Sequence, residues 1–507
     1  MGDLATIDKR HPDYDKACDG WRIVRDCVEG TRAVKRAAER YLPALYKQDP
    51  IDYQKRQKRA LFFGATKKTL NAFEGFIFRV NPEFKTPATM ADFMRDCTMT
   101  GVSFYDYCKQ VARDVTSVGR TGTLVDWDDP ANENRPFLVR YDTEDIIDWE
   151  YRRVKGHTVL SRLTLYECVS ETPQEVGLAP DQYERKETER WRIYELVEDA
   201  EEEFVVCRLW EKITTGSGET ATMRFSLVKT YFPNRRAVPL PRIPFVFHNV
   251  SGDQAKPDDI PMEGFAELNI SHYQTSADIE GALYVCGVPT PFACGFGSSD
   301  EQAEFILGSS KAWVSQNPDA KAGFIELSGD SIAPLERSMD KKERQMAALG
   351  ARMLESQTAA RTAEAFETVQ VRQSGEVASL SNITIMCSQT LSKTLRQVAW
   401  WMGAEETPDD FVDKVFVELN TDFVSSKLDA PLTQAVLNLY LSDPPTISYE
   451  TLFDILQRGQ LISSERTLKE ELAAIEKLKA EREAKAQADA QRQADLMKQQ
   501  TPPTPPE

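Results

Sequence analysis

The chain has 507 residues, of which 41% are hydrophobic, so it is long enough for several domains with sizeable cores. Its formal net charge of −18 excludes the class of proteins that bind nucleic acid over their whole surface, because phosphate binding needs clustered Lys and Arg. No apolar run reaches the roughly 18 residues of a membrane span, and we therefore expect no membrane partner.

Residues 1–118 have the periodicity of amphipathic helices, with apolar side chains recurring every three or four positions. We predict helices at 21–42, at 53–78 and from 91 to Gly119. The second helix carries a cluster of basic residues, Lys55, Arg56, Lys58 and Arg59. The favoured interpretation is a solvated helix face, and a contact with DNA or a partner is the alternative.

The stretch VTSVGRTGTLVDWDD, residues 115–129, resembles a phosphate-binding loop in its glycines. Such a loop follows a strand and opens a helix, whereas here a helix precedes the glycines and a β-prone segment follows them. Gly119 fits a left-handed helix C-cap, and Gly122 fits a turn into the strand. A structural turn is therefore the favoured interpretation, and a nucleotide site is the alternative.

In residues 120–250 the spacing of apolar side chains is no longer helical, and the pattern predicts antiparallel strands. Several of these strands alternate polar and apolar side chains. We expect these strands at 136–149, 157–169, 189–199, 202–212 and 223–232.

Helices return at residue 260. The expected elements are, in order, a helix at 261–285, strands at 311–316 and 322–329, helices at 338–356 and 367–403, a strand at 414–424, and short helices at 431–442 and 449–459. Between two of these helices, residues 356–366 are small and polar, which makes them a poor core segment.

The last segment, from Thr467, is rich in Ala, Glu, Lys and Gln and ends in the proline-rich TPPTPPE, which we expect to be extended. Its apolar stripe is narrow and consists of Leu468, Leu472, Ile475 and Leu478. Alone, such a helix buries little apolar surface, so it is either a frayed tail or one helix of a bundle formed by several chains.

The sequence contains no recognisable catalytic or metal-binding pattern. Its four histidines share no helix face, and both HExxH and GxSxG are absent. Carboxylates cluster at 126–129 and 142–148, where a solvated strand end is favoured over a site for a hard cation. We therefore expect no catalytic residue, no cofactor and no metal.

Six segments, taken in their order along the chain, are similar to a known family. They are HPDY at 11–14, RALFFGATKKTLNAFEGFIFR at 59–79, VGRTGTLVD at 118–126, RPFLVRYDTEDIIDW at 135–149, FAELNISHYQTSADIEGALYVCGVPTP at 265–291 and LNTDF at 419–423. Over roughly residues 10–430 the chain resembles the portal proteins of tailed bacteriophages, and more closely a portal-like family long labelled as a domain of unknown function.

The resemblance implies an α+β portal fold with wing, stem, clip and crown regions, assembled as a ring. The implied regions are a wing at 1–259, a stem helix at 260–283, a clip at 284–335, a second stem helix at 336–356, a tunnel loop at 357–367, a long helix at 368–403, a wing strand at 404–429, and a crown at 430–507 with a C-terminal helical tail or barrel.

The same resemblance implies a dodecameric ring at one capsid vertex, through which double-stranded DNA passes. The implied partners are terminase, a head-completion or adaptor protein and the major capsid protein, and the implied location is the virion, with the host cytoplasm during assembly. The candidate residues facing DNA are Lys341, Arg344, Arg352, Thr358, Arg361 and Thr362. Pairing of the basic residues with Glu343, Glu355 or a neighbouring chain is an equal alternative.

Two other functions stay open at this point. One is a cytosolic nucleotide-binding enzyme that uses the VGRTGT turn, and the other is a ring-forming structural adaptor without a DNA channel.

Overall fold

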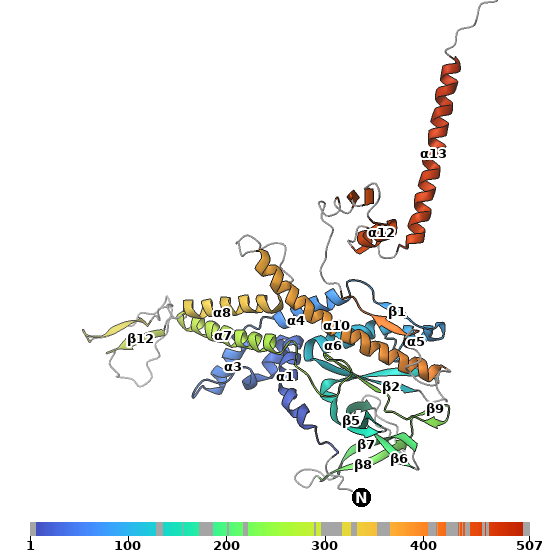
Figure 1. The fold of residues 1–507 in the computed structure, drawn as a ribbon. Helices are drawn as coiled ribbons and strands as arrows, with labels where there is room; N and C mark the ends of the chain where they lie inside the picture. Colours follow the sequence, from blue (N-terminus) through green and yellow to red (C-terminus); the bar gives the residue numbers. More distant parts are fainter. Residues whose placement is uncertain are drawn as a thin grey trace, which may run out of the picture. The chain divides into compact units, whose positions relative to one another are not determined.

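The protein, seen in a computed structural model, has a mixed α+β fold that divides into two compact units, Met1–Thr421 and Asp422–Glu507 (Figure 1). The structure describes residues 7–127, 135–154, 156–171, 186–199, 202–215, 222–287, 290–295, 317–325, 332–351, 366–403, 412, 414–421, 434, 437, 438, 440, 441, 447–458, 462 and 466–499.

The first unit begins with short helices, each of them shorter than the sequence periodicity predicts. They are α1 (Pro12–Glu29), α2 (Thr31–Arg36), α3 (Pro50–Arg59), α4 (Ala65–Ile77), α5 (Ala91–Arg95) and α6 (Phe104–Val118), with 3₁₀ turns at Ala38–Arg40 and Ala88–Met90. The three long helices expected at 21–42, 53–78 and 91–118 are therefore wrong as continuous elements.

Backbone geometry and distant contacts explain these breaks. Gly30 and Gly101 interrupt two of the predicted helices, with φ of 105° and 84°, values that favour glycine. Between α3 and α4 the chain is not helical, and α7 (Glu263–Gly287) supplies side-chain partners to its backbone. Ser276 Oγ accepts from the amide of Leu61 at 3.1 Å, and Asn269 Nδ2 donates to the carbonyl of Phe63 at 2.9 Å.

Antiparallel strands follow, as the alternation of side chains predicts. A three-stranded sheet has the order β11 (Phe245–Asn249), β2 (Arg120–Trp127), β3 (Pro136–Asp142). A five-stranded sheet has the order β4 (Ile146–Val154), β5 (His157–Glu171), β6 (Lys186–Asp199), β7 (Glu202–Thr215), β8 (Thr222–Tyr231). The single strand expected at 136–149 is split by a 3₁₀ turn at Thr143–Asp145, so its halves, β3 and β4, belong to different sheets.

The core of the first unit lies where α6 and α10 (Phe366–Met402) pack against the three-stranded sheet. The predicted helix at 367–403 is confirmed by α10. Gly122 lies inside β2 and not in a turn, so that expectation is wrong: a Cβ atom there would lie 2.2 Å from Cζ of Phe245. The residue is glycine because the Phe245 ring occupies that space.

The helices α7 and α8 (Ile332–Met346) pack side by side, and a hairpin of β12 (Thr290–Cys294) and β13 (Lys321–Ile325) joins the chain between them (Figure 1). The helix expected at 261–285 is confirmed by α7. The next helix begins at Ile332 rather than 338, and it passes into a π-helical turn, Ala347–Ala351. Of the two strands expected in this region, 322–329 is found in part as β13, and 311–316 lies outside the described residues.

Two further strand pairs complete the first unit: β1 (Glu83–Lys85) with β14 (Phe416–Glu418), and β9 (Asn234–Arg235) with β10 (Val238–Pro239). The strand expected at 414–424 is thus found in a shorter form, β14.

The second unit contains α12 (Tyr449–Arg458) and α13 (Leu468–Gln499), which confirm the helices expected from residues 449 and 467. Thr467 begins α13 with a capping box, because its hydroxyl accepts from the amide of Glu470 while a Glu470 oxygen accepts from the amide of Thr467. The proline-rich end lies outside the described residues. Among the helices that the structure describes, none has the length and apolar character needed to cross a bilayer.

Candidate functional site

The antiparallel pair α7 and α8 carries the predicted stem residues. His272 on α7 faces Glu343 on α8, with 3.2 Å between Nε2 and Oε1. Lys342 Nζ donates to the carbonyl oxygen of Ser271 at 3.0 Å and to the hydroxyl of Thr275. Burial lowers the pKa of the Lys342 amine. Lys342 therefore connects α8 to α7.

Two of the six predicted DNA-facing residues can be placed, and both lie on the solvent-exposed side of α8. Lys341 and Arg344 are exposed, and neither forms an ion pair with any residue that the structure describes. Glu343, the expected alternative partner, instead contacts His272. Both cations are thus accessible in the isolated chain. The other four candidates lie outside the described residues: Arg352, Thr358, Arg361 and Thr362.

The glycine turn between α6 and β2 is packed against the protein rather than open to a ligand. Gly119 is a left-handed C-cap with φ 83°, as predicted, and its amide donates to the carbonyl of Val115 at 3.1 Å. Its carbonyl accepts from the amide of Val250 at 3.2 Å, and a Cβ atom at Gly119 would lie 2.7 Å from the carbonyl oxygen of Asp259. The turn is therefore covered by the chain segment that leads into α7.

The arginine of this turn is also withdrawn from solvent. Arg120 is fully buried, with its guanidinium carbon 4.3 Å from the ring centre of Trp149 and 5.3 Å from that of Phe247. None of its three side-chain nitrogens has a hydrogen-bond partner among the described residues. Arg120 cannot contact a phosphate outside the protein from this position.

A buried chain of hydroxyl groups and one imidazole joins α6, the sheet and α10. Tyr107 Oη lies 2.6 Å from Thr123 Oγ1, which lies 2.7 Å from His248 Nε2, and His248 Nδ1 lies 2.8 Å from Thr390 Oγ1. Burial lowers the pKa of His248 to about 3, so the imidazole is neutral and links three elements. His248 lies in β11.

The carboxylates near the strand ends form ion pairs, and Asp142 and Glu144 remain partly exposed. Arg25 on α1 donates to Asp114 Oδ1 at 2.7 Å and to Glu144 Oε1 at 3.1 Å, and Arg140 on β3 donates to both Asp114 and Asp142. Within the described part of the chain, no group of three or more His, Cys, Asp or Glu side chains is arranged to hold a metal ion.

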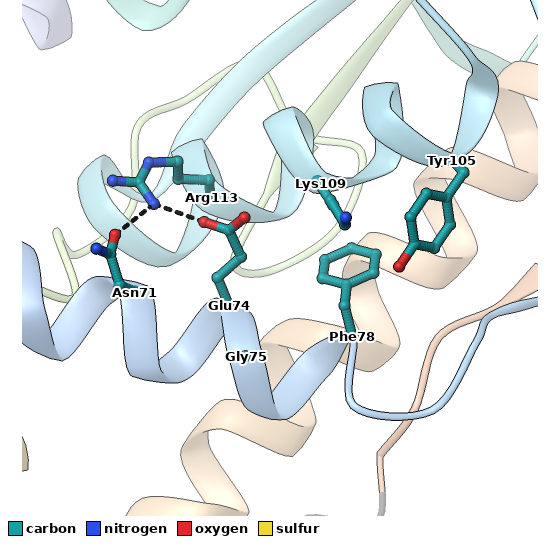
Figure 2. A pocket seen from close by; sticks show the side chains of 7 residues that line it. All are labelled: Asn71, Glu74, Gly75, Phe78, Tyr105, Lys109 and Arg113. Carbon is teal, nitrogen blue, oxygen red and sulfur yellow. Dashed lines mark hydrogen bonds and ion pairs between the residues drawn. The ribbon is translucent and has the colours of Figure 1, made fainter. Parts of the chain in front are cut away.

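An open cleft of about 510 Å³ lies between α4 and α6 (Figure 2). Arg113 donates to Asn71 at 2.9 Å and to Glu74, while Lys109 Nζ lies 4.3 Å from the ring centre of Tyr105. Both cations already have partners within the cleft wall. Sequence reasoning missed it; the available signal was the spacing of Lys109 and Arg113 by one turn on the polar side of α6.

Residues 261–402 match a family model described as a domain of unknown function (DUF4055). The matched segment is well under half of the chain, and it spans α7, the β12–β13 hairpin, α8 and α10. A search of curated proteins found no match.

Proposed function

We propose that the chain is a portal protein of a tailed bacteriophage, one subunit of a ring at a capsid vertex through which DNA is packaged and ejected. The observation that carries the proposal is the antiparallel pair α7 and α8, joined by the β12–β13 hairpin and followed by the long helix α10. In a portal ring these elements correspond to the stem, the clip and the helix that supports the tunnel loop.

Charge supports the same function. The chain carries a net charge of −18, so a channel lined by many copies would repel DNA phosphates and prevent the duplex from sticking. Lys341 and Arg344 are exposed cations on α8 within this acidic chain. Isolated contacts of this kind would be weak and salt-sensitive, because exposed charges are screened within about 10 Å at 0.1 M salt. Such contacts would slow loss of packaged DNA more than they would drive its entry.

The proposal includes the partners that a portal needs. The ring, with a dodecamer as the expected form, would dock terminase during packaging and an adaptor protein afterwards, in contact with the major capsid protein. The hairpin β12–β13 is the proposed docking element, since it is the connection between the two stem helices.

The deciding experiment is negative-stain electron microscopy of the purified protein together with its native mass. We expect closed rings with a central hole wide enough for duplex DNA. Monomers or dimers alone, at every salt concentration, would refute the proposal. Rings with a hole too narrow for a duplex would instead identify a structural adaptor.

A further inference from the structure

The helix α3 is attached to the protein almost entirely by polar contacts. None of its ten residues is buried. Its inner side is held by hydrogen bonds, from Tyr53 Oη to the carbonyl of Leu42 at 3.0 Å and from Arg56 Nη2 to Asp278 Oδ1 on α7 at 2.7 Å. Most helices of this length are stabilised by burying an apolar face, which α3 does not do in the single chain.

Large apolar side chains surround α3 and face solvent. Leu45 is 55% exposed, Tyr46 89%, Ile51 63% and Leu61 63%. Ile51 shares one side of α3 with Lys55 and Lys58, because their spacing places all three within about 60° at 100° per residue. We call this region the α3 surface, and it consists of Leu45, Tyr46, Lys47, Ile51, Lys55, Lys58 and Leu61.

The α3 surface is basic in a chain that is strongly acidic. It contains three lysines and no Asp or Glu, although Lys55 also lies 3.0 Å from Asp52. The surrounding segment, residues 44–68, has seven Lys or Arg and two Asp, a net charge of +5, and one of these bases, Arg56, pairs with Asp278. Because the whole chain carries −18, the remainder carries −23. A second copy of the chain therefore presents a large excess of carboxylates to this surface, and oppositely charged surfaces attract and orient each other during association.

We propose that the α3 surface binds an acidic surface of a second copy of this chain and forms one side of the contact between neighbouring subunits. This inference rests on the proposed function, in which copies of the chain assemble, and it specifies which surface of each copy makes the contact. Exposed Tyr and aliphatic side chains beside the bases favour a protein over nucleic acid, since phosphates would leave them uncovered. A closed ring needs two different complementary faces on each copy, and the α3 surface supplies a basic one.

The test compares two double charge reversals that change the net charge equally. Lys55→Glu with Lys58→Glu alters the α3 surface, and Lys9→Glu with Lys256→Glu alters two exposed lysines outside it. Native mass spectrometry over a dilution series gives the concentration at which half the subunits are assembled. We expect the first pair to raise that concentration by about tenfold or more and the second to leave it close to wild type.

A third variant tests the apolar part without changing charge: Tyr46→Ser with Ile51→Ser should also weaken assembly, but without altering its salt dependence. All these side chains are exposed, so circular dichroism should show folded subunits in every case. In wild-type rings mixed from ¹⁴N and ¹⁵N subunits, a zero-length carbodiimide should join Lys55 or Lys58 to carboxylates of the other isotope.

The outcomes separate this inference from the proposed function. Wild-type rings together with unchanged assembly of the Lys55/Lys58 variant would overturn the α3 inference alone. A wild-type protein that never assembles would overturn both. If the Lys55/Lys58 variant forms rings as the wild type does but binds duplex DNA more weakly, the α3 surface contacts nucleic acid. That result also overturns the inference.

Discussion

At the residue scale, Arg120 places a guanidinium among aromatic rings, and none of the described residues supplies it with a carboxylate partner. Burial lowers its pKa to about 9, and only the tyrosines Tyr151 and Tyr14 act in the opposite direction. Stacking on Trp149 contributes about 2 kcal/mol or more in a desolvated position, whereas removing the charge from water costs several kcal/mol. We expect the desolvation cost to be the larger of the two, so that Arg120 lowers the stability of the isolated chain.

We therefore expect Arg120→Met to raise the free energy of unfolding by about 1 kcal/mol or more, because Met fills similar space without a charge. Urea unfolding followed by tryptophan fluorescence measures the change. Arg120→Ala is the matched control and should destabilise the protein, since it leaves a cavity. A clear loss of stability in Arg120→Met would mean that the guanidinium has a partner in the purified protein.

His248 gives a second prediction, for the pH dependence of stability. Its pKa is about 3 in the folded chain, against about 6.5 for an exposed imidazole. Between these values the unfolded chain binds a proton that the folded chain does not, so acidification lowers the free energy of unfolding, by about 1.4 kcal/mol per pH unit. Above about pH 6.5 neither state binds this proton, and the contribution is constant.

Replacing His248 with Gln removes this titration. Wild type should lose stability faster than His248→Gln as the pH falls from 6.5 to 4.5, when each is measured by urea unfolding at several pH values. The carboxylates titrate equally in both proteins, so the difference in slope isolates His248. Parallel stability profiles would contradict a buried neutral imidazole.

At the scale of elements, the periodicity of the sequence predicts well which segments are helices or strands, and it predicts poorly where they begin and end. The helices α7, α10 and α13 follow from apolar spacing alone, and the C-cap at Gly119 follows from helix, glycine and strand in that order. The break between α3 and α4 could not be predicted, because it depends on side chains of Ser276 and Asn269 more than 200 residues away.

The candidate site shows the same division. Lys341 and Arg344, two of the candidate DNA-facing residues, are exposed on α8. The role of Lys342 was missed, since only the packing of α7 against α8 shows that its amine meets the Ser271 carbonyl. The ion pairs of Asp114 were missed for the same reason: Arg25 lies 89 residues away in sequence.

Lys341 is exposed whereas its neighbour Lys342 contacts α7, and this difference permits a test of the α7–α8 pair with a matched control. If rings form, Lys341→Gln with Arg344→Gln should leave assembly and packaging rate unchanged and should increase loss of DNA after packaging. Lys342→Gln is the control and should instead destabilise the subunit by about 1 kcal/mol, because it removes hydrogen bonds to α7. Unchanged DNA retention in the double variant would refute a channel role, and failure to form rings would place these cations between subunits.

At the scale of the whole molecule, the chain exposes surfaces that a single subunit leaves uncovered. The α3 surface is one of them, and the apolar stripe of α13 is another. Leu472 is 43% exposed and Leu478 55% exposed on a helix of 32 residues. By the helical rise of 1.5 Å per residue, α13 is about 48 Å long, and its stripe is too narrow to stabilise it alone in water.

If the chain assembles as proposed, we expect α13 to pack against neighbouring copies, because other chains would supply apolar surface that covers the stripe. Hydrogen exchange measured on rings should then show slow exchange of the amides from Leu468 to Leu478. Leu472→Ser with Leu478→Ser should abolish that protection, whereas Lys477→Ser with Lys479→Ser, which alters neighbouring exposed positions, should retain it. Complete exchange of the wild-type segment within seconds would show that α13 is a frayed tail, and the ring would then have to close through other surfaces such as α3.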